Sequence, residues 1–260
     1  MAHISFSELQ NWAKCPMYHK ITYIDKTYKF EGNLHTAFGR AMHYVCELAV
    51  AGKISDCFGP SLFKQKFMEE VESLPNPEEL DEDLFEQMIP QGAILATRAI
   101  PALRRHFGNF ELVGVEDMLY EEIEKGTLDI GDKKFKGFVD LIIKTEDGKV
   151  HIVDWKTCGW GWDAEKKSDK MVNYQLTLYK HFFAKKHDLD PSTIETHFGL
   201  LKRTAEKDQV EIFRITSGPK KTNNALNLLH KALYNIEKKN FIKNRLSCRR
   251  CDLYKTKYCT

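Results

Sequence analysis

The hydrophobic pattern of the chain changes its period near residue 110. Residues 112–123, 134–143 and 150–156 are rich in Val, Ile, Phe and Tyr and have the length of strands. Asp147-Gly148 lies between the last two runs, and this dipeptide is a strong signal for a tight hairpin. We therefore expect three consecutive strands, the last two of them antiparallel neighbours. This requirement excludes an all-helical fold.

Helical signals dominate the first 110 residues. Ser5 to Glu8 predict a capping box, in which Ser5 caps a short helix and Glu8 reaches back to it. This helix should end before Cys15-Pro16, and a second helix is expected over residues 38–51. Residues 61–107 are also predicted to be helical. Interruptions are expected at the four prolines of this stretch, Pro75, Pro77, Pro90 and Pro101.

The second half of the chain alternates between the two periods. We expect a helix over residues 170–186, strands over 193–202 and 209–216, and a helix from Pro219 to about residue 243. This order predicts an α/β fold: a small mixed β-sheet flanked by helices, with a helical N-terminal part and a Cys-rich C-terminal tail. A single domain over residues 1–260 is expected. Its parts are a helical region at 1–110, an α/β core at 111–217, and a helix and tail at 218–260.

Composition narrows the class of protein. Hydrophobic residues make up 42% and charged residues 29%, as is usual for globular proteins. No apolar run reaches the roughly 18 residues that cross a bilayer, and the first residues lack the pattern of a signal peptide. We expect no membrane partner and a cytoplasmic location, in the host cytoplasm if the protein is viral.

The cysteines point to ligands rather than disulfides. There are seven: Cys15, Cys46, Cys57, Cys158, Cys248, Cys251 and Cys259. An odd number in a reducing compartment argues against a disulfide framework. Cys248, Cys251 and Cys259 give three candidate ligands at one end, while a closed metal site needs four. Cys15 is the expected fourth. A Cys-x-x-Cys pair serves zinc, redox and iron–sulfur sites alike, so the spacing leaves the occupant open.

Charge is concentrated in two segments. Residues 219–260 carry eleven Lys or Arg and two acidic residues, whereas residues 69–90 carry nine acidic residues and no Lys or Arg. A basic segment of this kind can follow a nucleic-acid backbone. Two solvated helix faces of opposite sign would give the same pattern.

Three charged residues lie at the ends of neighbouring predicted strands. Asp154 and Lys156 are two apart on one strand and so project to the same face, and the hairpin places Asp140 across from Asp154. Two neighbouring carboxylates repel each other, and a divalent cation such as Mg²⁺ or Mn²⁺ relieves that repulsion. The nearby lysine can stabilise charge on a phosphate while the metal activates water, as phosphodiester hydrolysis requires. An ordinary salt bridge between Asp154 and Lys156 is the alternative.

Two further features have open interpretations. Glu116, in the first strand, suits an outer metal ligand, a base or a surface salt bridge. Trp160 and Trp162, between glycines, suit stacking on bases or packing under the neighbouring helix.

Several motifs together resemble one nuclease family. Gly137-Phe-Val-Asp140, Val153-Asp154-Trp155-Lys156-Thr157 and Gln175-x-x-x-Tyr179 resemble the RecB-like branch of the PD-(D/E)xK superfamily. So do Ser7-x-Leu9 with Cys15-Pro16-x-Tyr18, Gly39-Arg40-x-x-His43, and the cysteine tail, which is similar to that of AddB-type and CRISPR-associated members. The motifs occur in family order and span residues 5–259.

The resemblance assigns roles. It implies a restriction-endonuclease-like core in which His43, Asp140, Asp154 and the backbone carbonyl of Trp155 ligate the metal. Lys156 would be the catalytic lysine. Gln175 and Tyr179, four apart on one helix face, would hold the substrate backbone near the metal. The cysteines at positions 15, 248, 251 and 259 would hold a 4Fe–4S cluster that clamps the chain ends, with Zn²⁺ as the alternative.

The function implied is a metal-dependent DNA nuclease, a single-strand exonuclease for which the resemblance favours 5′→3′ digestion, acting in recombination, repair or DNA processing. A structure-specific or flap endonuclease would use the same chemistry. A non-catalytic DNA-binding recombination scaffold is the alternative of another class, but it needs no metal-binding set. No helicase motif is present, so an unwinding or recombination partner would be a separate chain.

Overall fold

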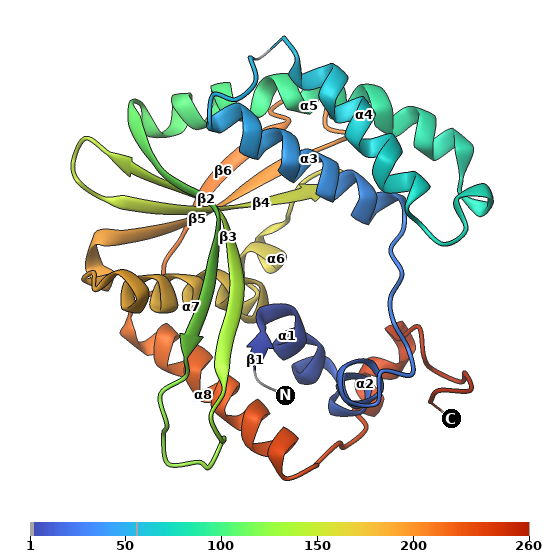
Figure 1. Ribbon diagram of the computed structural model, residues 1–260, viewed down its shortest axis with the longest axis vertical. Coiled ribbons are helices and arrows are strands. Elements are labelled where there is room, and N and C mark those ends of the chain that lie inside the picture. The colour runs from blue at the N-terminus through green and yellow to red at the C-terminus, as the bar shows by residue number, and fades with distance from the viewer. Residues whose placement is uncertain (1–2, 56, 260) are drawn as a thin grey trace.

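The computed structural model describes residues 3–55 and 57–259. Its centre is one mixed sheet (Figure 1). The strands are β1 (His3–Ser5), β2 (Phe110–Glu122), β3 (Lys134–Thr145), β4 (Val150–Cys158), β5 (Ile194–Lys202) and β6 (Val210–Ile215). Their order is β1-β3-β4-β5-β6, with β2 paired to β3. The pairs β1–β3 and β4–β5 are parallel and the others antiparallel, which confirms the expected small mixed sheet.

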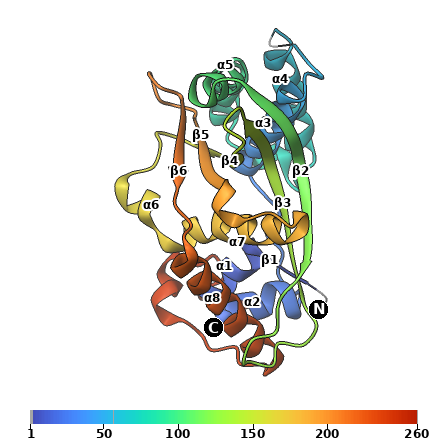
Figure 2. The ribbon, with the colours of Figure 1, turned by 90° about the vertical axis from the view of Figure 1, so that its left-hand side faces the viewer.

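Helices cover both faces of this sheet (Figure 2). They are α1 (Phe6–Lys14), α2 (Pro16–His19), α3 (Leu34–Val50), α4 (Gly59–Glu72), α5 (Glu82–Phe107), α6 (Ala164–Ser168), α7 (Lys170–His187) and α8 (Pro219–Glu237). A π-helical segment, η1 (Lys20–Ile24), and three short 3₁₀ segments complete the order: η2 (Pro77–Glu79), η3 (Pro191–Thr193) and η4 (Arg245–Arg250). Within residues 3–55 and 57–259, no helix is both long and apolar enough to cross a membrane.

Two hydrophobic cores share the sheet. Helices α3, α4 and α5 pack against one face, where Leu141, Val153 and Trp155 contribute from the strands. Helices α1, α7 and α8 pack against the other face, where Ile152 and Phe198 contribute. Because β4 and β5 are covered on both sides, their burial runs almost continuously instead of alternating.

Strand β3 changes its partner part-way along one edge. Its residues 134–136 pair with β1 and its residues 141–144 pair with β4, while β2 runs along the whole of its other edge. The last β3–β4 pair is Leu141 with Val153. Beyond that pair the two strands separate, so Asp140 and Asp154 lie where the sheet opens.

The N-terminal helical region differs from expectation at two prolines. Pro75 and Pro77 lie in the break between α4 and α5, as predicted. Pro90 and Pro101 lie inside α5, so the prediction of breaks there was wrong. A proline removes one backbone hydrogen bond from a helix. Here α5 continues because its apolar face is buried along most of its length, which outweighs that local cost.

The two chain ends also differ from expectation. Ser5 caps α1 by accepting a hydrogen bond from the Glu8 amide, as predicted. The Glu8 carboxylate does not reach back, because it is buried against His19, with Nε2 2.8 Å from Oε1. Strand β1 was not predicted, since three residues carry no periodic signal. The last long helix stops at Glu237 instead of continuing to residue 243.

Candidate active site

Asp140 takes the place of a missing strand partner. Where β4 leaves β3, the backbone amide of Trp155 has no carbonyl of β3 to bind, and it donates to Oδ2 of Asp140 at 2.8 Å. This hydrogen bond fixes the Asp140 side chain at the opening of the sheet. The hairpin register therefore brings Asp140 and Asp154 together, as the sequence predicted.

Asp154 is held from two sides. Its side chain is almost fully buried, and Oδ1 accepts a hydrogen bond of 2.8 Å from Nε2 of Gln175 on α7. Oδ2 forms an ion pair with Nζ of Lys156 at 2.5 Å. Lys156 therefore already places a positive charge beside this buried oxygen.

His43 and Glu116 complete a cluster around Asp140. His43 extends from α3, with Nδ1 3.4 Å from Oδ2 of Asp140. One ligand atom each from His43, Glu116 and Asp140 lies within 4.8 Å of the other two. Glu116 belongs to β2 between the pairs Val115–Leu141 and Asp117–Val139, and its backbone has a left-handed φ of 48°. That conformation brings the Glu116 side chain to the site, so the metal-ligand interpretation of this residue gains support over a surface salt bridge.

The electrostatics of the site show a shortage of positive charge. Burial raises the pKa of Asp140 well above its usual value, and the neighbouring Asp154 raises it further. Burial acts to lower the pKa of Lys156, but Asp154 and Asp140 together outweigh it and raise that pKa. Burial lowers the pKa of His43, against the attraction of Asp154. A neutral imidazole beside repelling carboxylates is the form that binds a metal.

Gln175 and Tyr179 face the same carboxylate from α7. Besides binding Asp154, Nε2 of Gln175 lies 3.4 Å from the hydroxyl of Tyr179. The Tyr179 ring lies directly against β3 at Gly137, where an added Cβ would come within 2.8 Å of the ring. The glycine of the Gly137-Phe-Val-Asp140 motif is thus explained by the close approach of α7 to the strand.

Trp155 joins the site through its backbone and the core through its side chain. Its amide binds Asp140, and a hydrogen bond between its backbone and His43 weakly opposes the lowering of the imidazole pKa by burial. Its ring is buried against Gly199 on β5. In the following loop, Trp160 is 78% exposed, while Trp162 packs on Phe198 and Phe213 of β5 and β6 and lies under Lys166 of α6.

The sequence profile of the PD-(D/E)XK nuclease superfamily matches residues 3–256. The chain belongs to this superfamily. One similar solved structure is a presumed exonuclease from Eubacterium rectale, with 14% identity, a TM-score of 0.57, and coverage of 96% of this chain and 86% of that one. At this identity the likeness shows the fold alone. Another, SSO0001, has 18% identity over 67% of this chain and 79% of its own, and its TM-score of 0.39 is too low to support an argument. No curated protein matches significantly.

The donor set of this PD-(D/E)XK protein fits a hard divalent cation. Carboxylates of Asp140 and Glu116 with the imidazole of His43 suit Mg²⁺ or Mn²⁺, whereas Asp154 lies outside this close group and its Oδ2 is paired with Lys156. Sequence reasoning gave Glu116 little weight because its strand pattern is ordinary. The available signal was register: in an antiparallel pair with β3, Glu116 falls close to Asp140.

Four cysteines from the two ends of the nuclease line one small cavity. They are Cys15, Cys248, Cys251 and Cys259, and none forms a disulfide. Hydrogen bonds also join the ends: Asn244 donates to the Lys14 carbonyl at 2.8 Å, and Lys14 donates to the Arg250 carbonyl at 3.3 Å. Among the described residues, no three of these sulfurs lie within 4.8 Å of one another.

Proposed function

We propose that this protein is a Mg²⁺- or Mn²⁺-dependent deoxyribonuclease of the RecB-like branch, acting as a single-strand exonuclease with 5′→3′ polarity favoured. The whole chain would work as one nuclease domain. One observation carries the proposal: Asp140, Asp154, Lys156 and His43 converge where β3 and β4 separate. A DNA-binding scaffold has no need of two repelling buried carboxylates.

The residues divide the work of hydrolysis. His43, Asp140, Asp154 and the carbonyl of Trp155 would hold the metal, with Glu116 as a further ligand. The metal would supply a Lewis acid and an activated water. Lys156 holds a positive charge beside Asp154 and would stabilise the negative charge that develops on the phosphate.

Gln175 and Tyr179 would position the DNA backbone at this site. Both lie on the α7 face that meets Asp154. The side-chain amide of Gln175 and the hydroxyl of Tyr179 would donate hydrogen bonds to phosphate oxygens. The exposed Trp160 follows the catalytic strand and is available for stacking on a base.

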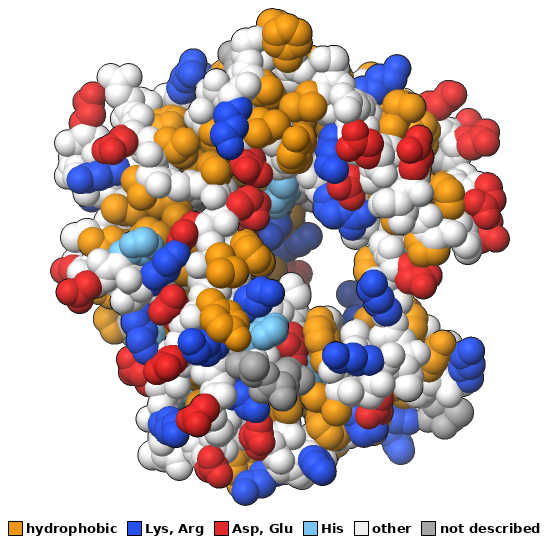
Figure 3. All heavy atoms as spheres, viewed as in Figure 1, with side chains coloured by type: hydrophobic (Ala, Val, Ile, Leu, Met, Phe, Trp, Pro, Cys, Tyr) orange, Lys and Arg blue, Asp and Glu red, His pale blue; other side chains and the backbone are white. Residues whose placement is uncertain are grey.

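The shape of the molecule supports a single strand as substrate. The space-filling view shows an opening between α3 and the N-terminal helices, with Lys and Arg side chains inside and beside it (Figure 3). A single strand that passed through this opening would have to enter by a free end. Duplex DNA would need a separate helicase or recombination partner, which agrees with a role in recombination or repair.

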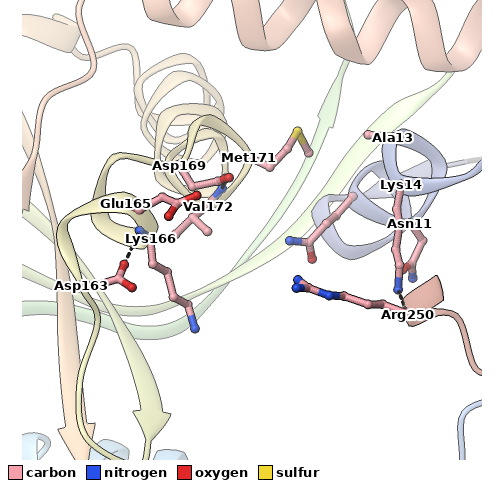
Figure 4. A pocket seen from close by; sticks show the side chains of 11 residues that line it. Asn11, Ala13, Lys14, Asp163, Glu165, Lys166, Asp169, Met171, Val172 and Arg250 are labelled. Atoms are coloured by element: carbon pink, nitrogen blue, oxygen red, sulfur yellow. Dashed lines mark hydrogen bonds between the residues drawn. The ribbon is translucent and has the colours of Figure 1, made fainter. Parts of the chain in front are cut away.

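A pocket of about 710 Å³ between α1 and the α6–α7 segment offers a backbone path. Lys166 and Arg250 point into it from opposite walls, and Lys14 also lines it (Figure 4). The acidic residues Asp163 and Asp169 are engaged in capping, since they accept hydrogen bonds from the Lys166 and Val172 amides. Glu165 lines the pocket as well, so the three cations would attract phosphates beside an equal number of acidic residues.

We further propose that the four clustered cysteines bind a 4Fe–4S unit. A single Zn²⁺ with Zn–S bonds of about 2.3 Å would hold its sulfurs roughly 3.8 Å apart. No three of the described sulfurs lie within 4.8 Å of one another, so they would have to move closer to hold zinc, which stays the alternative occupant. Arg250 lies between Cys248 and Cys251 in the sequence and also lines the pocket between α1 and the α6–α7 segment.

The test uses single-stranded DNA labelled at its 5′ or 3′ end, and the same sequence as a closed circle. Wild-type protein with Mn²⁺ should degrade the linear strands, release the 5′ label first and leave the circle intact. Lys156→Met keeps the length of the side chain but removes its charge, and should lose at least about a hundredfold in rate.

Each alternative has its own outcome. Cutting of the circle at the linear rate would replace the exonuclease by an endonuclease. DNA binding without cleavage under Mg²⁺ or Mn²⁺ would favour the scaffold. Wild-type rates in a folded Lys156→Met protein would refute the assigned site.

A further inference from the structure

A second cluster of metal-ligating side chains lies on the opposite face of the sheet from the carboxylates. His151 is the second residue of β4 and its register partner on β5 is Glu195, so both point to the α5 side. His197, two residues after Glu195, points the same way. One ligand atom from each of the three residues lies within 4.8 Å of the other two. None of these residues takes part in the proposed nuclease chemistry.

We propose that His151, Glu195 and His197 form a binding site for a divalent transition-metal ion, with Zn²⁺ the best match. The donor set of two imidazoles and one carboxylate is one that zinc accepts. The site stands roughly 10 Å along β4 from Asp154, by the rise of a strand, and is separated from it by the sheet itself.

The imidazoles leave two buried nitrogens unused. Nδ1 of His151 and Nδ1 of His197 are buried and have no hydrogen-bond partner in the described part of the chain. The two residues are 6% and 3% exposed. A buried polar atom without a partner is costly, and a metal ion would satisfy both nitrogens at once. Burial lowers the pKa of His197 to about 3, so its ring is neutral, as a ligand must be.

A hydrogen-bond chain sets the tautomer of His151. The Thr145 hydroxyl donates to Oδ1 of Asp147 at 2.5 Å, and the same hydroxyl lies 2.9 Å from Nε2 of His151. Since the hydroxyl proton is committed to Asp147, its oxygen accepts from Nε2, which therefore carries the ring proton. Nδ1 then presents a lone pair toward Glu195. Carboxylate and hydroxyl partners of this kind commonly orient metal-binding histidines.

Glu195 divides its two oxygens between cations and imidazole. Oε1 lies 3.2 Å from Nη2 of Arg214 and 3.4 Å from Nζ of Lys149. Oε2 lies 3.9 Å from Nδ1 of His151. The side chains of Lys149 and Arg214 are about half exposed, so solvent screens their repulsion of a bound ion. The oxygen that faces the imidazoles remains free for a metal.

The spacing suits zinc after a small closure. Zinc bonds of about 2.0–2.2 Å in a tetrahedron separate donor atoms by roughly 3.3 Å, and the 3.9 Å gap between His151 and Glu195 exceeds this only slightly. Phe107 packs on the rings of His151 and His197 and shields the site. The exposed His106, with its ring centroid 5.6 Å from that of His197, or a water can occupy the fourth position.

The experiment titrates full-length protein with Co²⁺, a spectroscopic substitute for Zn²⁺, in excess Mg²⁺, and then displaces it with Zn²⁺. His197→Phe removes one ligand while keeping an aromatic ring against Phe107. His151→Gln removes another, and His181→Gln is the matched control on α7. The cysteine and carboxylate sites are present in every variant, so the difference between proteins isolates the new site.

Wild type and His181→Gln should bind one Co²⁺ more than His197→Phe and His151→Gln. The difference spectrum should have intense tetrahedral bands without a thiolate-to-cobalt transition. Thr145→Val should weaken binding by about 10- to 100-fold. Zn²⁺ should raise the melting temperature of wild type but not of His197→Phe, whose Mg²⁺-dependent cleavage should stay at the wild-type rate. Equal metal binding by wild type and both ligand variants would overturn the proposal, whether or not the protein is a nuclease.

Discussion

Gly137→Ala tests whether the close contact between α7 and β3 is what positions the active site. An added Cβ would lie 2.8 Å from Cε1 of Tyr179, whereas ordinary contacts begin near 3.4 Å. The Tyr179 ring must therefore move by at least about 0.6 Å, in a core where overpacking costs roughly 1–3 kcal/mol. At about 2–4 °C per kcal/mol for a domain near this size, the melting temperature should fall by about 2–12 °C.

The same shift should reduce activity more than stability alone explains. Tyr179 lies beside Gln175, which in turn holds Asp154, so the displaced ring disturbs the carboxylate that would bind the metal. Misplacement of this order costs up to about 100-fold in rate. Thermal unfolding and initial cleavage rates at saturating Mn²⁺, measured on the same folded preparation, separate the two effects.

The control and the double variant make the test sharp. Gly114→Ala, also in the sheet, puts its Cβ 3.6 Å from Ile142 and should change little. Combining Gly137→Ala with Tyr179→Leu should recover much of the stability lost by Gly137→Ala alone, because the clashing ring is gone, while activity stays low. Strictly additive losses of stability, or full activity in Gly137→Ala, would refute the positioning role of this contact.

Three further outcomes are expected. Asp140→Asn should stabilise the metal-free protein, because the folded state raises the pKa of this carboxyl and so disfavours its charged form. The gain in free energy of unfolding should grow as pH rises from about 3.9. Urea unfolding across pH checks this, and a gain that does not change with pH contradicts it. His43→Ala should need more metal and lose its preference for Mn²⁺ without losing DNA binding, whereas an unchanged metal titration would make His43 structural. Protein purified without oxygen should be brown, with about four irons per chain, and Cys15→Ala should bleach it as fully as Cys251→Ala. Closing so long a loop should stabilise the fold by on the order of 4–5 kcal/mol, by the chain-entropy estimate for disulfides. A coloured Cys15→Ala protein of normal stability would therefore show that Cys15 is not a ligand. A colourless wild-type protein with one bound zinc would show that zinc occupies the site instead of the cluster.

The sequence correctly predicted those parts of the fold that depend on residues close together in the chain. The strand periodicity and the Asp147-Gly148 turn fixed the register that sets Asp140 across from Asp154. The helix caps and the fold class followed from equally local signals. Those signals sufficed because a strand or a hairpin is specified by residues close together in the chain.

The parts that sequence missed depend on long-range packing. Helix α5 continues through Pro90 and Pro101 because its apolar face is buried by elements elsewhere in the chain. Glu116 reaches the site through the register of β2 against β3 and a left-handed backbone conformation, neither of which a local sequence pattern predicts. His151 and His197 are isolated in sequence, and only the parallel pairing of β4 with β5 brings them together.

The separation of β3 from β4 explains why the carboxylates occur where they do. In a continuous ladder the Trp155 amide would bind a β3 carbonyl, and no side chain would be needed there. Once the strands part, Asp140 supplies that acceptor with one oxygen, just as Asp154 binds Gln175 with one oxygen. Each carboxylate thus keeps its other oxygen free of amide donors, and mutual repulsion makes both sites costly without a cation. The separation of the strands therefore leaves one backbone amide without a strand partner, and Asp140 accepts from that amide. The resulting proximity of two carboxylates favours the metal ion that they would hold.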